Sequence, residues 1–184
     1  MRVISGIARG TKLNSIDNIS TRPTLDRVKE PLFSIIQSYL QESNVLDLFA
    51  GSGALGIEAL SRGANHCTFC DKSYESVKML KQNLQKTKLE DKETIFVQDY
   101  KKCLKNLIGK KYDIIFIDPP YKLDIAVDSI KLILEYKILS KDGIIILETD
   151  EEERELSKIE NTELEVYDVR KYGRVSLIFL RERG

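Results

Sequence analysis

Several residue types and patterns are scarce in this chain of 184 residues, and each scarcity excludes a class of protein. The single histidine, His66, excludes nucleophilic triads built on histidine. Three cysteines, an odd number, argue against the disulfide framework of a secreted domain. No apolar run approaches the ~20 residues of a membrane span, and Arg9 interrupts the N-terminal segment before a signal-peptide core can form. We therefore expect a cytoplasmic protein with no membrane partner.

The composition is that of a soluble globular protein, with 42% hydrophobic and 32% charged residues. The length predicts a single domain over residues 1–184, large enough to bury a core without disulfides or a structural metal. The formal net charge is zero, but residues 1–31 hold six basic and three acidic side chains. This bias suits a surface that binds a polyanion, and it equally suits an ordinary solvated surface. Charge alone leaves both interpretations open.

Apolar runs rich in β-branched residues alternate with segments of helical periodicity. The runs predict strands over residues 45–49, 66–71, 94–98, 113–118 and 144–148. The segments between them predict helices over residues 54–62, 74–86, 100–108 and 125–135. Strands and helices that alternate in this way indicate an α/β fold, in which a parallel sheet is covered by helices on both faces.

The two ends of the chain depart from this alternation. Residues 164–171 and 175–181 predict a closing hairpin, which makes a doubly wound, seven-stranded, mostly parallel sheet with one antiparallel strand. At the front, residues 2–7 and 11–15 predict a small hairpin, and a helix follows that ends near Tyr39. Pro31 lies within this helix, so the helix either kinks there or begins there. Residues 1–40 are therefore an extension that precedes the sheet.

The first candidate site is a glycine loop between the first strand of the sheet and the next helix. Gly51, Gly53 and Gly56 follow this strand; Gly51 can adopt backbone angles closed to other residues, and Gly53 lets a ligand approach the chain. Asp71, at the end of the second strand, is placed to accept hydrogen bonds from ribose hydroxyls. Asp99, after the third strand, can accept a hydrogen bond from an adenine amine. The combination fits a cofactor that contains adenosine.

Two cofactors and a purely structural turn compete as explanations of this loop. The three glycines satisfy the dinucleotide pattern, which is weak evidence by itself. A dinucleotide places a pyrophosphate at the helix N-terminus, where Asp47 would repel it. S-adenosylmethionine is instead a cation, so Asp47 favours this methyl donor. The predicted donor site consists of Asp47, Phe49, Gly51, Gly53, Asp71, Lys72, Asp99 and Tyr100.

The second candidate site is Asp118-Pro119-Pro120-Tyr121, directly after the fourth strand. The two prolines fix the backbone and can hold the Asp118 carboxylate beside a main-chain carbonyl. Two acceptors so placed can bind both N–H groups of an exocyclic amine and favour its attack on a methyl group. Tyr121 offers a flat ring on which an extruded base can stack. The four residues form the predicted catalytic site.

The order of Asp-x-Phe-x-Gly-x-Gly and Asp-Pro-Pro-Tyr resembles the amino-methylating branch of the S-adenosylmethionine-dependent methyltransferases. Further motifs resemble the RsmD-type 16S ribosomal RNA guanine-N2 methyltransferases, and they lie at residues 2–6, 9–10, 22–24, 26–30 and 46–64. The resemblance implies a Rossmann-like class I methyltransferase fold, S-adenosylmethionine as cofactor, and 16S ribosomal RNA, free or in an assembling small ribosomal subunit, as partner. It also implies methylation of the N2 amine of one guanine.

Four arginines of the front extension are the expected phosphate contacts, namely Arg2, Arg9, Arg22 and Arg27. One alternative is a DNA adenine-N6 or cytosine-N4 methyltransferase, which shares Asp-Pro-Pro-Tyr. The chain has no spare segment of ~100 residues for separate target recognition, and this weighs against that alternative. The other alternative is a non-catalytic RNA-binding factor in ribosome assembly.

Cys67-x-x-Cys70, with His66 beside it, resembles a fragment of a metal site. On a strand these two cysteines point to opposite faces, and the only other cysteine is Cys103. We therefore expect no metal. The acidic run over residues 150–153 is expected to begin a helix, where negative charge is favourable.

Overall fold

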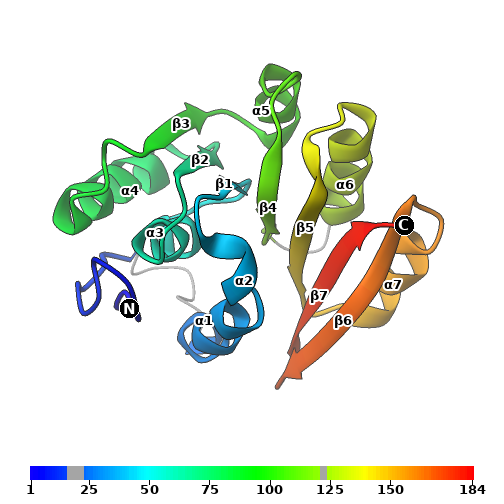
Figure 1. The fold of residues 1–184 in the computed structure, drawn as a ribbon, viewed down its shortest axis with the longest axis horizontal. Coiled ribbons are helices and arrows are strands. Elements are labelled where there is room, and N and C mark those ends of the chain that lie inside the picture. The colour runs from blue at the N-terminus through cyan, green and yellow to red at the C-terminus, as the bar shows by residue number, and fades with distance from the viewer. Residues whose placement is uncertain (16–22, 121–123) are drawn as a thin grey trace.

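The computed structural model describes residues 1–15, 23–120 and 124–184. Its centre is a seven-stranded sheet with strand order β3-β2-β1-β4-β5-β7-β6 (Figure 1). The strands are β1 (Asn44–Asp47), β2 (His66–Asp71), β3 (Glu93–Val97), β4 (Tyr112–Ile117), β5 (Leu139–Thr149), β6 (Leu164–Tyr172) and β7 (Val175–Glu182). The helices are α1 (Pro23–Ile35), α2 (Gln37–Leu40), α3 (Ala54–Ser61), α4 (Tyr74–Thr87), α5 (Tyr100–Asn106), α6 (Ile125–Glu135) and α7 (Glu152–Ile159).

Strands β1 to β5 run parallel, whereas β7 pairs antiparallel with both β5 and β6. The predicted doubly wound, mostly parallel sheet with one antiparallel strand is therefore confirmed. The strand order reverses beside β1, which pairs with β2 on one side and β4 on the other: Val45 lies opposite both Cys67 and Ile114. In open α/β sheets, ligands bind at the carboxyl ends of the strands beside such a reversal.

Two apolar layers cover the faces of the sheet, as expected for a parallel sheet. One layer packs Leu32 of α1, Ile57 of α3 and Leu80 of α4 onto the sheet. The other packs Leu104 of α5 and Ile130 of α6. Figure 1 shows α1 to α4 on one side of the sheet and α5 to α7 on the other. The core thus holds the strand ends, and the loops that follow them, in fixed positions.

Most predicted elements are present, and the largest shift is at β5. This strand was expected to begin at residue 144, where the continuous apolar run starts, but it begins at Leu139. Residues 140–143 are polar or glycine and lack an apolar pattern, yet Leu139 pairs with Tyr112 of β4. α7 begins with Glu152 and Glu153 in its first turn, as the acidic run predicted.

The N-terminal hairpin is much reduced from the one expected, because residues 2–7 and 11–15 form no strands. A single bridge joins Arg2 and Lys12, and the chain turns through Gly6 and Gly10, which both have positive φ. Helix α1 continues through Pro31, so the helix does not begin at that proline. None of the described helices is both long and apolar enough to cross a membrane.

Candidate active site

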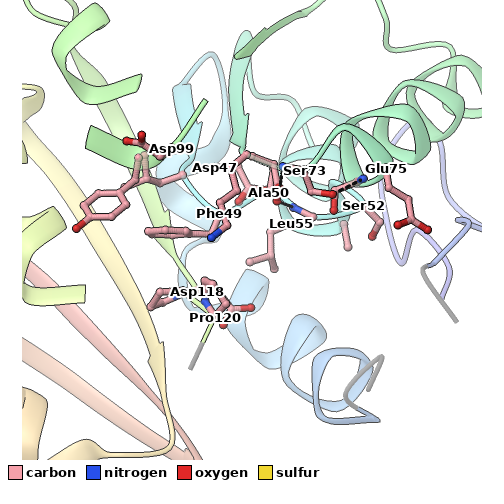
Figure 2. Close-up of a pocket in the computed structure, with 18 of the residues that line it drawn as sticks. Asp47, Phe49, Ala50, Ser52, Leu55, Ser73, Glu75, Asp99, Asp118 and Pro120 are labelled. Carbon is pink, nitrogen blue, oxygen red and sulfur yellow. Dashed lines mark hydrogen bonds between the residues drawn. The ribbon is translucent and has the colours of Figure 1, made fainter. Parts of the chain in front are cut away.

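A cavity of about 610 Å³ lies at the carboxyl ends of β1, β2, β3 and β4. Figure 2 shows Phe49 and Asp99 toward one end, Ser52, Ser73 and Glu75 toward the other, and Asp118 with Pro120 alongside. The cavity lining brings together most of the predicted donor and acceptor residues, namely Asp47, Phe49, Gly51, Asp71, Lys72, Asp99, Tyr100, Asp118, Pro119 and Pro120. The motifs on four separate strands therefore meet at one site.

The glycine loop contains two glycines that differ in what surrounds them. Gly51 has φ +56°, lines the cavity, and would place a Cβ in open space. Gly53 has φ +85°, and its Cβ would lie 2.2 Å from Cδ1 of Leu80. The expectation that Gly53 gives a ligand access does not match this geometry, because Gly53 faces the packing of α4 and is not among the lining residues. Gly51 is the glycine whose missing side chain leaves room in the cavity.

Asp71 connects the glycine loop to the end of β2. Its Oδ2 accepts the N–H of Gly51 at 2.8 Å, and its Oδ1 accepts the N–H of Ser73 at 2.8 Å. A carboxylate offers about four acceptor sites, so these two bonds leave capacity for ligand hydroxyls. Asp71 thus orders the loop and still presents acceptors at the cavity.

Two aromatic rings form the part of the cavity beside β3. Phe49 and Tyr100 lie with their ring centroids 5.7 Å apart, at an interplanar angle of 45°. The Tyr100 hydroxyl donates to Oδ2 of Asp128 at 2.6 Å, which fixes the ring. Asp99 caps the N-terminus of α5, where its Oδ1 accepts the N–H of Lys102 at 3.1 Å. An apolar wall with acceptors at its edge suits a flat heterocycle that carries an amine.

Asp47, the last residue of β1, is a buried carboxyl group with only 2% of its surface exposed. Its Oδ2 accepts the N–H of Gly56 at 3.1 Å. The pKa of Asp47 is raised from 3.8 to about 7, chiefly by burial. The Gly56 hydrogen bond opposes this shift, and the negative charges of Asp118 and Asp71 add to it. A cation that entered the cavity would favour the ionised form of this carboxyl group.

The raised pKa of Asp47 predicts how stability depends on pH. Between pH 4 and 7 the unfolded chain releases this proton while the folded chain keeps it, so Asp47 makes stability fall as pH rises. Asp47→Asn removes this loss, which amounts to a few kcal/mol at ~1.4 kcal/mol per pKa unit. Urea unfolding of both proteins at pH 5 and pH 8 measures this effect. The free energy of unfolding of the variant, relative to that of the native protein, should be higher at pH 8 than at pH 5. An equal difference at both pH values contradicts the raised pKa.

The acceptor motif follows β4, the strand next to β1. Asp118 is half-buried and lines the cavity with Pro119 and Pro120, and its charge acts on Asp47. Tyr121 lies outside the described residues. Two carboxyl groups, one buried and one partly accessible, therefore face the same cavity from adjacent strands.

Comparisons with known proteins agree with this arrangement. Residues 1–181 match the sequence model of the family described as "Conserved hypothetical protein 95". The chain belongs to this family. The Bacillus subtilis protein named "Putative rRNA methyltransferase YlbH" is 38% identical over 188 residues, which cover 100% of both chains.

Two further similarities support membership of the conserved hypothetical protein 95 family. "Ribosomal RNA small subunit methyltransferase D" of Haemophilus influenzae is 38% identical over 156 residues, 83% of this chain and 80% of the relative. The solved structure "Putative methyltransferase yhhF" from Escherichia coli has a TM-score of 0.83 at 28% identity, and covers 100% of this chain and 99% of its own. The RsmD-type family and the methyltransferase fold, both predicted from the motifs, are confirmed.

In this family member, sequence reasoning missed a buried charge cluster on α3. Glu58 is fully buried; its Oε1 lies 3.1 Å from Nζ of Lys29, and its Oε2 accepts from Nε of Arg62 at 2.9 Å. Lys29 was counted among the basic residues of the front extension, but it is fully buried and also donates to the carbonyl of Arg2 at 2.8 Å. The sequence signal for this cluster was Glu58 itself, a single charged residue within the otherwise apolar sequence of α3.

Three of the four arginines expected to contact RNA belong to the described residues, and all three are exposed. Arg2 and Arg9 are exposed on the N-terminal segment, and Arg27 is exposed on α1. Arg22 lies outside the described residues. The two ends of the N-terminal segment, Met1 and Ser15, line the cavity. This segment therefore forms part of the cavity wall, which the sequence did not indicate.

The cysteines belong to the core on both faces of the sheet. Cys67 lies in the layer that contains α3, and Cys70 lies in the opposite layer with Cys103. Burial raises the pKa of the Cys67 thiol. Over residues 1–15, 23–120 and 124–184, no group of three or more His, Cys, Asp or Glu side chains could hold a metal ion.

Proposed function

We propose that this chain transfers a methyl group from S-adenosylmethionine to the exocyclic N2 amine of a guanine in 16S ribosomal RNA. The observation that carries the proposal is the single cavity that joins the glycine loop, buried Asp47 and Asp118-Pro119-Pro120. The proposal is supported by relatives named as ribosomal RNA methyltransferases, which match the chain over most of its length.

The cavity fits the proposed donor in charge and in shape. Asp47 would offset the donor's positive charge, because its buried carboxyl group ionises more readily beside a cation. Asp71 and Gly51 would hold the ribose of the donor and the methionine part attached to it, and Lys72 would lie at the rim of the cavity. Phe49, Tyr100 and Asp99 would hold the adenine. When bound, S-adenosylmethionine supplies an electrophilic methyl group carried on a sulfonium.

The chain's own contribution to the reaction is to position and polarise the amine. Asp118 and the Pro119 carbonyl accept hydrogen bonds from the two N–H groups of guanine N2, which favours a pyramidal nitrogen with an available lone pair. Asp118 can accept the proton that the methylated nitrogen releases. Tyr121 is proposed to stack on the base. Alignment of the reacting atoms in one cavity supplies much of the remaining acceleration.

The front extension, residues 1–40, is proposed to bind the RNA. Arg2, Arg9 and Arg27 are exposed and positively charged, and they suit phosphate contacts that position the RNA without reading its sequence. Arg22 is proposed to act with them. The rest of residues 1–184 would then hold the donor and the target base as one unit.

Nucleoside analysis of methylated RNA tests the proposed function. Purified protein is incubated with radiolabelled S-adenosylmethionine and one of three substrates: protein-free 16S RNA, small ribosomal subunits from cells that lack the protein, or DNA. We expect N2-methylguanosine from at least one substrate. N6-methyladenine or N4-methylcytosine from DNA would support the DNA methyltransferase instead. Binding without any methyl transfer would support the assembly factor.

A further inference from the structure

The N-terminal segment carries an exposed isoleucine that the proposed function does not use. Ile7 has 77% of its surface exposed, more than any other aliphatic side chain among the described large hydrophobic residues. It lies in the turn formed by residues 5–10, which we call the N-terminal turn. An isolated exposed isoleucine is common on proteins. The backbone that carries this one is, however, unusually well fixed.

Backbone atoms on both sides of Ile7 bind to α3. The N–H groups of Ile4 and Ser5 donate to the two carboxylate oxygens of Glu58, at 2.9 and 3.1 Å. The N–H of Ile7 donates to the carbonyl of Ser61 at 2.9 Å. The Ser61 hydroxyl accepts from the N–H of Ala8 at 3.0 Å and donates to the carbonyl of Ser5 at 2.7 Å. Four hydrogen bonds thus join the N-terminal turn to the helix, and a fifth joins the residue before it.

The contact between the N-terminal turn and α3 is also tight. A Cβ on Gly6 would lie 1.8 Å from the carbonyl oxygen of Ser61, and the φ of +88° also favours glycine. The Glu58 that accepts two of the hydrogen bonds is itself buried in ion pairs with Lys29 and Arg62. Loosening the turn would leave this buried charge short of partners, which is costly. The structure therefore holds the Ile7 side chain out into solvent.

The surroundings of Ile7 select the chemistry of its partner. Arg2, Arg9 and Lys12 are exposed on the same segment, and residues 1–15 contain no acidic side chain. Exposed positive charges on the same segment as an exposed apolar side chain match a nucleic acid, in which phosphates flank the faces of the bases. Apolar side chains such as isoleucine can wedge against or between bases and unstack them.

The residues on either side of the N-terminal turn connect it to the candidate active site. Asn83 of α4 accepts the N–H of Asn14 through Oδ1 at 2.7 Å. Its Nδ2 donates to the carbonyls of Asn14 and Ser52, at 3.0 and 2.9 Å. Ser52 lies in the glycine loop, and Met1 and Ser15 line the cavity. The segment that presents Ile7 is therefore fixed relative to the donor site.

We propose that the N-terminal turn binds the substrate RNA and that Ile7 packs against a nucleobase while Arg2, Arg9 and Lys12 contact the neighbouring phosphates. This inference rests on the proposed function, because it assumes that RNA is the substrate. It adds an apolar base contact to an interaction otherwise attributed to phosphate binding.

Filter binding of protein-free 16S RNA over a range of salt concentrations tests the proposal. The variants are Ile7→Ala, Arg9→Ala and the matched control Ile108→Ala, whose isoleucine is 56% exposed just beyond α5. We expect Ile7→Ala to weaken binding roughly 5- to 30-fold through lost apolar burial, with the salt dependence unchanged. Arg9→Ala should reduce the slope of log affinity against log salt by ~1. Ile108→Ala should bind like the native protein.

Three results would overturn the base contact. The first is that Ile7→Ala binds protein-free RNA as tightly as the native protein does. If this variant nevertheless binds small ribosomal subunits weakly, the turn contacts a ribosomal protein instead. The second is a reduced salt slope, which would mean that the phosphate contacts had moved. The third is a fall in Tm beyond that of Ile108→Ala, which would make the loss structural. Methyl transfer by the native protein, measured in parallel, tests the proposed function separately.

Discussion

Asp118→Asn is expected to lower the rate of single-turnover methyl transfer about 10²- to 10³-fold, the size of effect seen when one fixed polar group is removed from a reacting centre. Asparagine keeps the shape of the side chain but loses the negative charge that would hold the amine and receive its proton. The rate is measured with saturating S-adenosylmethionine and the RNA substrate identified by nucleoside analysis.

Donor affinity must be compared in the same variant, because Asp118 also acts on Asp47. Removing the Asp118 charge lowers the pKa of Asp47, so calorimetry is best done at pH 8, where Asp47 is mostly ionised in both proteins. There the two affinities should agree within a few-fold. Asp142→Asn is the matched control, since Asp142 is exposed near the amino end of β5, whereas the cavity lies at the carboxyl ends of the strands. A fully active Asp118→Asn would place the methyl acceptor elsewhere.

Gly51→Val is expected to weaken S-adenosylmethionine binding roughly 10- to 100-fold, the consequence of placing a side chain in volume that the ligand needs. The Cβ of Gly51 meets no atom within 4 Å, and the residue lines the cavity, so the valine would extend into that space. Calorimetry with the donor measures the loss.

The backbone at Gly51 requires its own control, because φ is +56° and any L side chain is strained there. The control is Gly173→Val in the β6–β7 turn, where Gly173 has φ +63° and equally open surroundings but does not line the cavity. Both variants should lose similar stability, and only Gly51→Val should lose donor affinity. Equal affinities would remove the glycine loop from the donor site. Gly53→Val is a poor probe, because it would strike Leu80 and disturb the packing of α4.

The sheet and the site could be predicted because their signals are local in the sequence. The bounds of β2 and α6 match the predicted ranges, since each is a continuous apolar or periodic run. The alternation of such runs determined the fold class. Asp47, Asp71, Asp99 and Asp118 each lie at or just after the end of a parallel strand, so the fold class alone predicted that they would meet.

The features that escaped prediction depend on residues far apart in the chain. Glu58 and Lys29 are 29 positions apart, and each alone resembles an ordinary surface charge. Position 53 requires glycine because a Cβ there would strike Leu80, which lies on another helix. The front hairpin was expected to form strands, but four of its backbone N–H groups donate to Glu58 or Ser61 instead. Pairings of this kind carry no periodicity that a single sequence reveals.

Helix α3 is a spacer of fixed length between the glycine loop and the N-terminal turn. It begins beside the glycine loop and ends at Ser61, which holds the N-terminal turn, and its eight residues span about 12 Å. One residue inserted between Gly53 and Glu58 would rotate Glu58 by ~100° about the helix axis, away from Lys29 and the turn. The length of this helix is therefore fixed by both of its ends at once. All eight of its residues are buried, so an inserted or deleted residue would also disturb the packing of the helix.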